Sequence, residues 1–135
     1  MNIRQLFFAL ALLLGGVEMQ AQEAKNDYFV LNRNVKQLKA IALAAGDLAE
    51  LDGEKYGVFQ VVICGKSVKD LANAETMAPF MKLLNENEVE VIACGFSLKK
   101  FEVEEAELPE GVKVVTNGIY FGFERQKAGA YSITL

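Results

Sequence analysis

The sequence predicts an α/β fold, a three-layer α/β/α sandwich built on a mostly parallel sheet of about five strands. Short apolar runs alternate along the chain with segments of helical periodicity, the order that places helices on both faces of a parallel sheet. The run Val58–Ile63 is apolar except for Gln60, as is typical of a strand buried on both faces. Of the 135 residues, we expect 1–21 to be a signal peptide and 22–135 to form one domain.

The first half of the domain contains two strands joined by a helix. The first strand covers 28–31, and Asn34 with Gln37 is expected to form a capping box at the start of the helix. Apolar residues then recur at helical spacing up to Ala49, and Gly53 ends the helix in the left-handed conformation. The second strand covers 58–63 and ends at Cys64-Gly65.

The second half repeats the alternation of strands and helices. A turn or short helix at 67–73 precedes a helix at 77–84, which Thr76 caps and whose first turn holds Pro79. A third strand, 89–93, ends at Cys94-Gly95, and a short helix begins at Ser97. The expected remaining elements are an acidic surface loop at 102–110, a strand at 112–115, a helix from Thr116-Asn117-Gly118 to about 128, and a last strand at 131–135.

The first 21 residues have the features of a secretory signal. Arg4 supplies a positive start, and Leu6–Gly16 is an uncharged apolar run of 11 residues. A membrane-spanning helix needs about 20 such residues. We therefore expect cleavage near Ala21 and export to a periplasm, with no stable membrane anchor afterwards; the alternative is an uncleaved N-terminal anchor.

Composition excludes several function classes. With 14 Lys and Arg against 18 Asp and Glu, the chain is mildly acidic and lacks the basic footprint of a nucleic-acid-binding protein. Histidine is absent, which removes Ser-His and Cys-His dyads and His-ligated metals. Because the chain has no glycine-rich nucleotide-binding motif, no histidine and only two cysteines, we expect no cofactor and no metal.

The two cysteines occupy equivalent places in two similar segments. Val61–Lys69 and Val91–Lys99 share the pattern Val-hydrophobic-x-Cys-Gly-x-Ser-hydrophobic-Lys. Each cysteine ends a buried strand, at the edge of the sheet where ligands of such folds bind. Free backbone N–H groups at a helix start lower a thiol's pKa and favour the nucleophilic thiolate. We therefore expect a sulfur there that is open to a visiting partner.

Two other interpretations of the cysteines remain open at this point. Free cysteine is often a buried, inert core residue. Alternatively, Cys64 and Cys94 form a structural disulfide, which requires their strands to be neighbours; the sequence does not give the strand order.

Three segments together resemble the DsrE/DsrF-like family of sulfur-relay proteins and their exported relatives. They are VIACGFSLK at 91–99, LPEGVKVV at 108–115 with Asn117-Gly118, and QKAGAY at 126–131. The resemblance covers about 28–135 and implies an α/β/α fold, homo-oligomers (trimers or hexamers) and, in active members, a cysteine that carries sulfur as a persulfide. Cys94 matches that cysteine. Phe96 departs from the Asn that exported members often have there.

The resemblance suggests an exported sulfur carrier or sulfurtransferase-like protein. Cys94 is then the candidate persulfide carrier, and Cys64 a possible accessory thiol. The partners implied are a sulfur-donor or acceptor protein, or a small sulfane-sulfur compound. The candidate binding residues are Gly95, Phe96, Ser97, Asn117 and Gly118.

The alternative is a non-catalytic oligomeric binding or scaffold module with the same fold, in which Cys94 is buried. A thiol-disulfide oxidoreductase is disfavoured because the chain has no Cys-x-x-Cys motif. Tyr120, Phe121 and Phe123 are interpreted as aromatic residues of the core or of a subunit interface.

Overall fold

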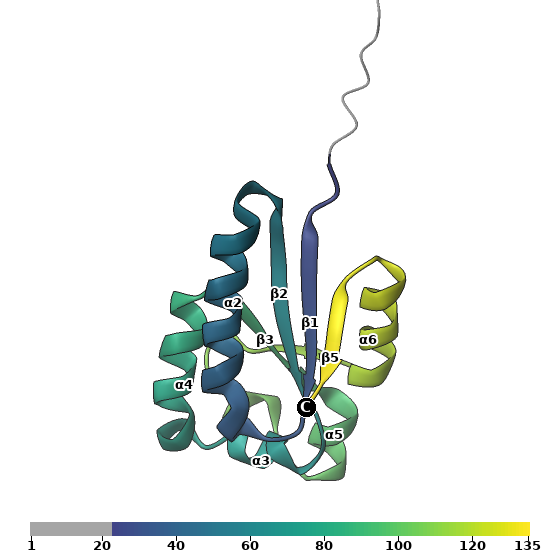
Figure 1. Cartoon of the computed structure of the whole chain (residues 1–135). Helices are drawn as coiled ribbons and strands as arrows, with labels where there is room; N and C mark the ends of the chain where they lie inside the picture. Colours follow the sequence, from purple (N-terminus) through teal and green to yellow (C-terminus); the bar gives the residue numbers. More distant parts are fainter. Residues whose placement is uncertain (1–22) are drawn as a thin grey trace, which may run out of the picture.

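The structure is a computed structural model that describes residues 23–135, and the predicted signal peptide lies outside them. Five strands form one parallel sheet in the order β4-β3-β2-β1-β5 (Figure 1). Their bounds are β1 Asn26–Asn32, β2 Tyr56–Ile63, β3 Val89–Cys94, β4 Lys113–Val115 and β5 Tyr131–Thr134. The α/β sandwich predicted from the sequence is confirmed, and every strand pair is parallel.

Helices connect the strands and form the outer layers. The longer ones are α2 Leu38–Asp52, α4 Ala74–Glu86 and α6 Gly118–Lys127, and the short ones are α3 Val68–Leu71 and α5 Gly95–Lys100. Figure 1 shows α2 and α4 together on one face of the sheet, α6 beside β5, and α3 and α5 where the strands end. Short 3-10 turns lie at Val35–Gln37, Gly53–Lys55, Gly65–Ser67 and Glu105–Glu107.

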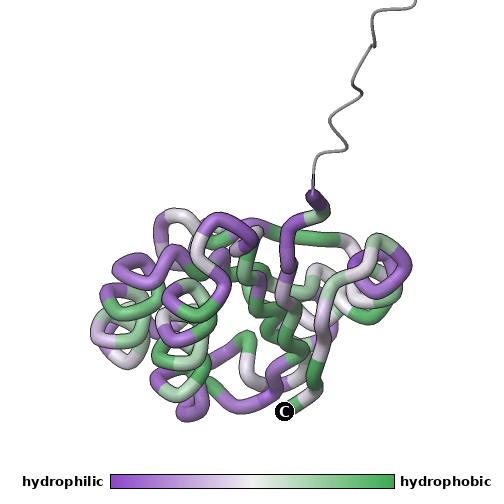
Figure 2. Tube along the Cα trace, turned by 45° about the horizontal axis from the view of Figure 1, so that its top comes forward, coloured by the Kyte–Doolittle hydropathy of each residue, from purple (hydrophilic) through white to green (hydrophobic). Residues whose placement is uncertain are grey.

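The larger core lies between the sheet and the layer formed by α2 and α4. Alternate strand residues such as Val61 and Val91 meet buried residues of these helices such as Leu38 and Leu84. Figure 2 shows the apolar segments gathered on the central strands, whereas the helices alternate between polar and apolar positions. This alternation is the amphipathic pattern from which the helices were predicted.

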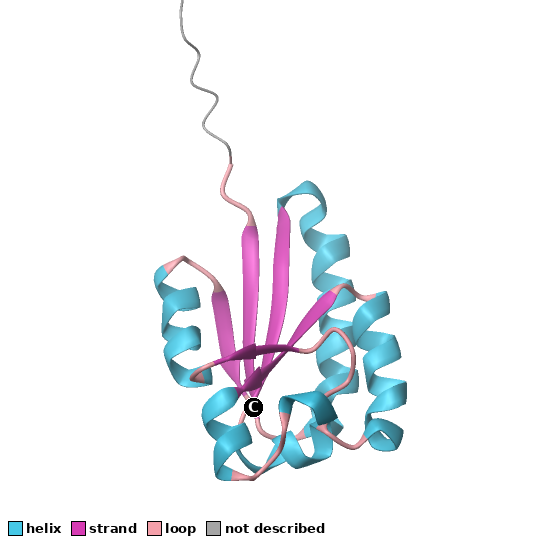
Figure 3. Ribbon diagram, turned by 180° about the vertical axis from the view of Figure 1, so that it is seen from behind, coloured by secondary structure: helices cyan, strands magenta, loops and turns pink. Residues whose placement is uncertain are grey.

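A smaller core lies on the opposite face, beneath α6. Phe29, Val62 and Ile92 are buried there with both cysteines, and Phe121 of α6 packs edge-on against Phe29 with ring centroids 6.0 Å apart. Gly122 lets the helix approach closely, since a Cβ atom built on it would lie 3.0 Å from the Phe29 ring. Figure 3 shows this face from behind, with α6 beside the short strand β5.

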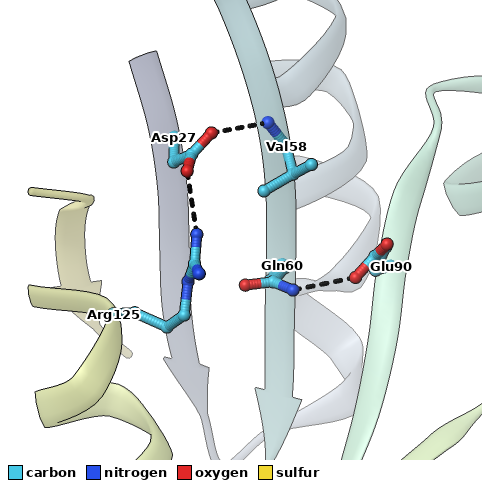
Figure 4. A network of polar contacts seen from close by, with 5 residues as sticks. All are labelled: Asp27, Val58, Gln60, Glu90 and Arg125. Carbon is cyan, nitrogen blue, oxygen red and sulfur yellow. Dashed lines mark hydrogen bonds and ion pairs between the residues drawn. The ribbon is translucent and has the colours of Figure 1, made fainter. Parts of the chain in front are cut away.

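The expectation that β2 is buried on both faces is wrong for its first half. Val58 is exposed, and the Gln60 amide donates a hydrogen bond of 2.8 Å to Glu90 on β3. Close by, Asp27 accepts hydrogen bonds from Arg125 and from the Val58 backbone (Figure 4). The physical reason is coverage: among residues 23–135, α6 covers this face, and it packs mainly over β1. The exposed half of the face therefore holds polar side chains.

Two predicted helix caps differ from the structure. Asn34 does cap the first helical turn, but the Gln37 side chain accepts a hydrogen bond from Asn32 instead of completing a capping box. The helix expected at 77–84 begins at Ala74, because Asn73 and not Thr76 is its N-cap. Within residues 23–135, no helix has the length and apolar character needed to cross a membrane.

Candidate functional site

The two cysteines lie side by side at the ends of neighbouring strands. The register of β2 and β3 pairs Val62 with Ile92 and Ile63 with Ala93, and Cys64 and Cys94 are the residues that directly follow this last pair. Both side chains belong to the smaller core beneath α6. Both are free thiols, so the structural disulfide left open by the sequence is not formed here.

The first residue of α6 lies directly on this thiol pair. The Gly118 N–H donates a hydrogen bond of 3.3 Å to the Sγ atom of Cys94. A Cβ atom built on Gly118 would lie 2.6 Å from Sγ of Cys64 and 3.2 Å from Cβ of Cys94. Only glycine therefore lets the start of this helix come so close to both sulfur atoms.

Asn117 fixes the position of that helix start. Its side-chain oxygen accepts hydrogen bonds from the N–H groups of Ile119 (2.9 Å) and Tyr120 (3.3 Å). This N-cap leaves the Gly118 N–H free to face the sulfur. Asn117, a candidate binding residue, thus has its side-chain oxygen engaged in capping.

The two similar cysteine segments differ in how they use their serines. The Ser97 hydroxyl accepts a hydrogen bond of 2.8 Å from the Gly65 N–H and is hydrogen-bonded to the Cys94 sulfur. The equivalent Ser67 instead donates to the backbone carbonyl of Arg33. Of the two equivalent serines, only Ser97 is engaged with a cysteine. Ser97 also connects the loops that follow β2 and β3.

The two thiols differ in acidity as a result. Burial is the largest influence on Cys94 and opposes its ionisation, but hydrogen bonds from Ser97, Gly118 and the Cys64 thiol together lower its pKa below the ordinary value. Burial, followed by the neighbouring Cys94, raises the pKa of Cys64 to about 12. Cys94 is thus the more acidic of the two thiols, and Cys64 is the one that stays protonated.

The expectation that the sulfur is open to a partner is wrong for this conformation. Cys94 is 3% exposed and Cys64 is 5% exposed. The reason is the helix that supplies the N–H donor: Gly118 has no side chain, so the start of α6 closes over the sulfurs. Activation of the thiol and its burial therefore have the same structural cause.

The other candidate binding residues surround this buried pair. Gly95 packs against β4, where an added Cβ atom would lie 2.9 Å from the Val115 carbonyl oxygen. The Phe96 N–H bonds the Thr116 carbonyl at 2.9 Å, and its side chain is 65% exposed. A cavity of about 950 Å³ opens beside Gly95, Phe96 and Thr116, and neither cysteine lines it.

The aromatic residues of α6 fall into two groups. Phe121 belongs to the smaller core, as expected, whereas Tyr120 and Phe123 are exposed. Ile119 beside them is exposed as well, so one side of α6 presents apolar groups to solvent.

Sequence reasoning missed two features, one at the thiol pair and one farther along the same face of the sheet. The first is the bond from Gly65 to Ser97, which joins residues 32 positions apart. The second is the polar group around Asp27 and Glu90 (Figure 4). The repeated Cys-Gly-x-Ser pattern contains a signal for the bond from Gly65 to Ser97. Each serine follows a strand of the sheet, and Ser97 reaches the loop that follows the neighbouring strand β2.

Comparison with known proteins places this architecture. Two solved structures share the fold: MTH1491, a protein of unknown function from Methanobacterium thermoautotrophicum, and BT1422, a conserved protein of unknown function from Bacteroides thetaiotaomicron. The first has a TM-score of 0.62 and 21% identity, over 82% of this chain and 99% of that one. The second has a TM-score of 0.63 and 19% identity, over 82% and 95% of the two chains.

A search of the curated proteins finds no match to this sequence. The model of the DsrE/DsrF-like family, in contrast, matches residues 26–121, a span that contains the sheet through β4, both cysteines and the start of α6. The chain belongs to the DsrE/DsrF-like family, a family related to sulfur relay.

Proposed function

We propose that this protein is an exported sulfur carrier that holds sulfane sulfur as a persulfide on Cys94. The observation that carries the proposal is the hydrogen bond from the Gly118 N–H to the Cys94 sulfur, at a site where Ser97 and Cys64 also help to lower the pKa of Cys94. These donors favour the thiolate, which is the form of cysteine that attacks sulfur. Family membership adds support, because the matched span of 26–121 includes Cys94 and the family is related to sulfur relay.

The chemistry needs no histidine. The Cys94 thiolate attacks the outer sulfur of a donor persulfide, a new bond forms to Sγ, and the donor leaves as a thiolate. In the return step an acceptor thiolate attacks the outer sulfur of the Cys94 persulfide, and Cys94 leaves as the thiolate again. The donors that favour the thiolate at rest also favour it as this leaving group, since both states place negative charge on the same atom.

Burial constrains the donor. With 3% of Cys94 exposed, a donor reaches the sulfur either as a small compound or by displacing the first turn of α6. The exposed Phe96 and the cavity beside it lie next to this turn and provide a contact surface for a donor. A closed site also shields the persulfide from water and oxidants.

Mass spectrometry with matched variants tests the proposal. Treating the Cys64→Ser variant with inorganic polysulfide should make the protein about 32 Da heavier, with the added sulfur mapped to Cys94. The mass of the matched variant Cys94→Ser should not change. A Cys64→Ser protein that stays unmodified while folded contradicts the proposal.

A second candidate is the non-catalytic binding or scaffold module, and the burial of both thiols favours it. The two functions differ in the reactivity of the folded protein. A carrier reacts with a thiol reagent at neutral pH through Cys94 alone, whereas a scaffold stays silent until denaturant exposes both cysteines. Counting modified thiols before and after unfolding separates them.

We propose further that the chain acts as a homo-oligomer in a periplasm. The exposed apolar residues Ile119, Tyr120 and Phe123 of α6 support self-association, because exposed apolar patches mark interaction surfaces. Tyr131 of β5 is also exposed, but it lies on the opposite face of the sheet, stacked on Tyr28. Light scattering after size exclusion should give a trimer or hexamer that Phe123→Glu dissociates, and a wild-type monomer would contradict this. Fractionation of expressing cells tests export directly.

A further inference from the structure

The backbone already places Cys64 and Cys94 at a distance that a disulfide can span. They follow Ile63 and Ala93, which are paired in the register of β2 and β3. Neighbouring strands run about 4.8 Å apart, and disulfides join Cα atoms about 4.4–6.8 Å apart. No change of strand order or register is needed to join the two sulfur atoms.

The side chains converge as well. Val62 and Ile92, which precede the cysteines by two residues on each strand, lie in the same small core as the two thiols. Sγ of Cys64 and Cβ of Cys94 both approach Gly118 so closely that a Cβ atom on that residue would lie 2.6 Å and 3.2 Å from them. Both thiols therefore occupy one compartment under the first residue of α6.

No other thiol of the chain competes for Cys94. The sequence contains two cysteines in total. Both are almost fully buried, which hinders a partner protein's thiol from reaching them and keeps Cys64 as the nearest nucleophile to any sulfur bound on Cys94. The Cys64 sulfur and the Cys94 side chain lie together beneath Gly118, so the Cys64 thiol is close to any sulfur that Cys94 carries.

We infer, building on the proposed function, that Cys64 is a resolving thiol which discharges the Cys94 persulfide within the chain, so that the protein releases hydrosulfide and keeps a Cys64–Cys94 disulfide. The substrate class is thus a sulfane-sulfur compound, and the product is inorganic sulfide. This activity differs from relay, in which the outer sulfur passes to an acceptor thiol.

The step balances without an external oxidant. Cys64 gives its proton to the outer sulfur of the persulfide, and its sulfur attacks Sγ of Cys94. The bond from Cys64 to Cys94 forms, the bond from Sγ to the outer sulfur breaks, and the outer sulfur leaves with the bonding pair as hydrosulfide. The sulfane sulfur is reduced and the two thiols are oxidised. A small-molecule dithiol then restores both thiols by two exchange steps and becomes a disulfide itself.

The environment of each thiol sets the order of events. At rest, burial and the neighbouring Cys94 keep the Cys64 proton in place, because they raise its pKa to about 12. Cys94 therefore meets the donor first. Once Cys94 carries the outer sulfur, the negative charge moves to that sulfur, which can then accept the Cys64 proton.

The test follows intact mass and sulfide together. Wild-type protein and the variants Cys64→Ser, Cys64→Ala and Cys94→Ser are treated with inorganic polysulfide, desalted, weighed, and then reduced with dithiothreitol. We expect wild type to become about 2 Da lighter and to release no sulfide on reduction, as a disulfide does. Both Cys64 variants should be about 32 Da heavier and release stoichiometric sulfide, as a persulfide does. Diamide, which oxidises thiol pairs without supplying sulfur, should also close the disulfide in wild type.

The outcomes separate this inference from the function on which it rests. If wild type keeps the added sulfur and releases sulfide as the Cys64 variants do, the resolving role is refuted and the carrier remains. If neither wild type nor the Cys64 variants take up sulfur, the carrier itself is refuted, and the resolving role with it. A wild-type protein in which diamide closes no disulfide refutes the geometric basis of the inference.

Discussion

Replacing Gly118 by alanine perturbs the thiol pair through one added methyl group. The new Cβ atom would lie 2.6 Å from Sγ of Cys64, 2.8 Å from Cγ1 of Val62 and 3.2 Å from Cβ of Cys94. None of these neighbours is the free end of a long side chain, so the start of α6 must move outward. Gly118→Ala should therefore lengthen the 3.3 Å hydrogen bond from this residue to Cys94.

The magnitude follows from two opposing effects. Overpacking a tight site costs about 1–3 kcal/mol. Alanine recovers about 0.4–1 kcal/mol, because it restricts the unfolded chain more than glycine does. We expect Gly118→Ala to lower the free energy of unfolding by about 0.5–2 kcal/mol in urea. We also expect the pKa of Cys94 to rise, because a donor to the thiolate is weakened.

Gly122→Ala is the matched control. It places the same methyl group on the same helix, 3.0 Å from the Phe29 ring and away from the cysteines. It should also lower stability, but the pH profile of Cys94 alkylation should stay that of wild type. If Gly118→Ala loses stability and leaves that profile unchanged, the Gly118 N–H does not set the acidity of Cys94 and the reasoning is refuted.

Three further predictions concern neighbouring contacts. Ser97→Ala leaves the partly buried Gly65 N–H without its partner, so the free energy of unfolding should fall by about 0.5–1.5 kcal/mol in urea. The pH profile of Cys94 alkylation should shift to higher pH, and an unshifted profile would contradict the role of the hydroxyl. Asn117→Ala removes the N-cap of α6 and should lower the free energy of unfolding by about 1 kcal/mol in urea. An unchanged urea midpoint would argue against this capping role. The raised pKa of Cys64 means that the folded state holds this proton more tightly, so its stabilising effect is present below pH 9.0 and is lost as the pH rises toward about 12. Urea midpoints of wild type should therefore fall more steeply over this window than those of Cys64→Ser, and parallel curves would contradict the shift.

Local patterns predicted the fold because the elements follow from nearby residues. The apolar strands, the glycine that ends α2 and the cap at Asn117 all depend on residues within a few positions. The observed start of α4 differs from the predicted one because the sequence offers two possible N-caps, Asn73 and Thr76. Either residue type can cap a helix, and only the packing of the whole helix selects one of them.

The candidate site was only partly predictable, because its contacts are long-range. The sequence placed both cysteines at strand ends, but whether their strands are neighbours depends on strand order, which short motifs do not encode. The burial of Cys94 depends on α6, whose first residue, Gly118, contacts the Cys94 sulfur from 24 positions further along the chain. The difference between the two serines is likewise tertiary, since Ser67 finds the Arg33 carbonyl and Ser97 finds the Gly65 N–H.

The exposed part of the sheet face beneath α6 has a signal in the sequence. Gln60 interrupts an otherwise apolar strand, and Glu90 occupies the equivalent place on the next strand. Two polar residues in register on one face indicate that this part of the face is not fully covered, since buried polar groups need partners. The signal depends on strand pairing, because Gln60 and Glu90 are 30 residues apart in the chain.

The central claim is that Cys94, and not Cys64, is the activated thiol of the folded protein. The most direct measurement is the rate of alkylation by iodoacetamide as a function of pH, with mass mapping of the modified residue in the native state. The account predicts modification of Cys94 alone, with a half-maximal rate at a pH below that of an ordinary cysteine, and an unmodified Cys64 until the protein unfolds. Equal modification of both cysteines, or no reaction before unfolding, would contradict it.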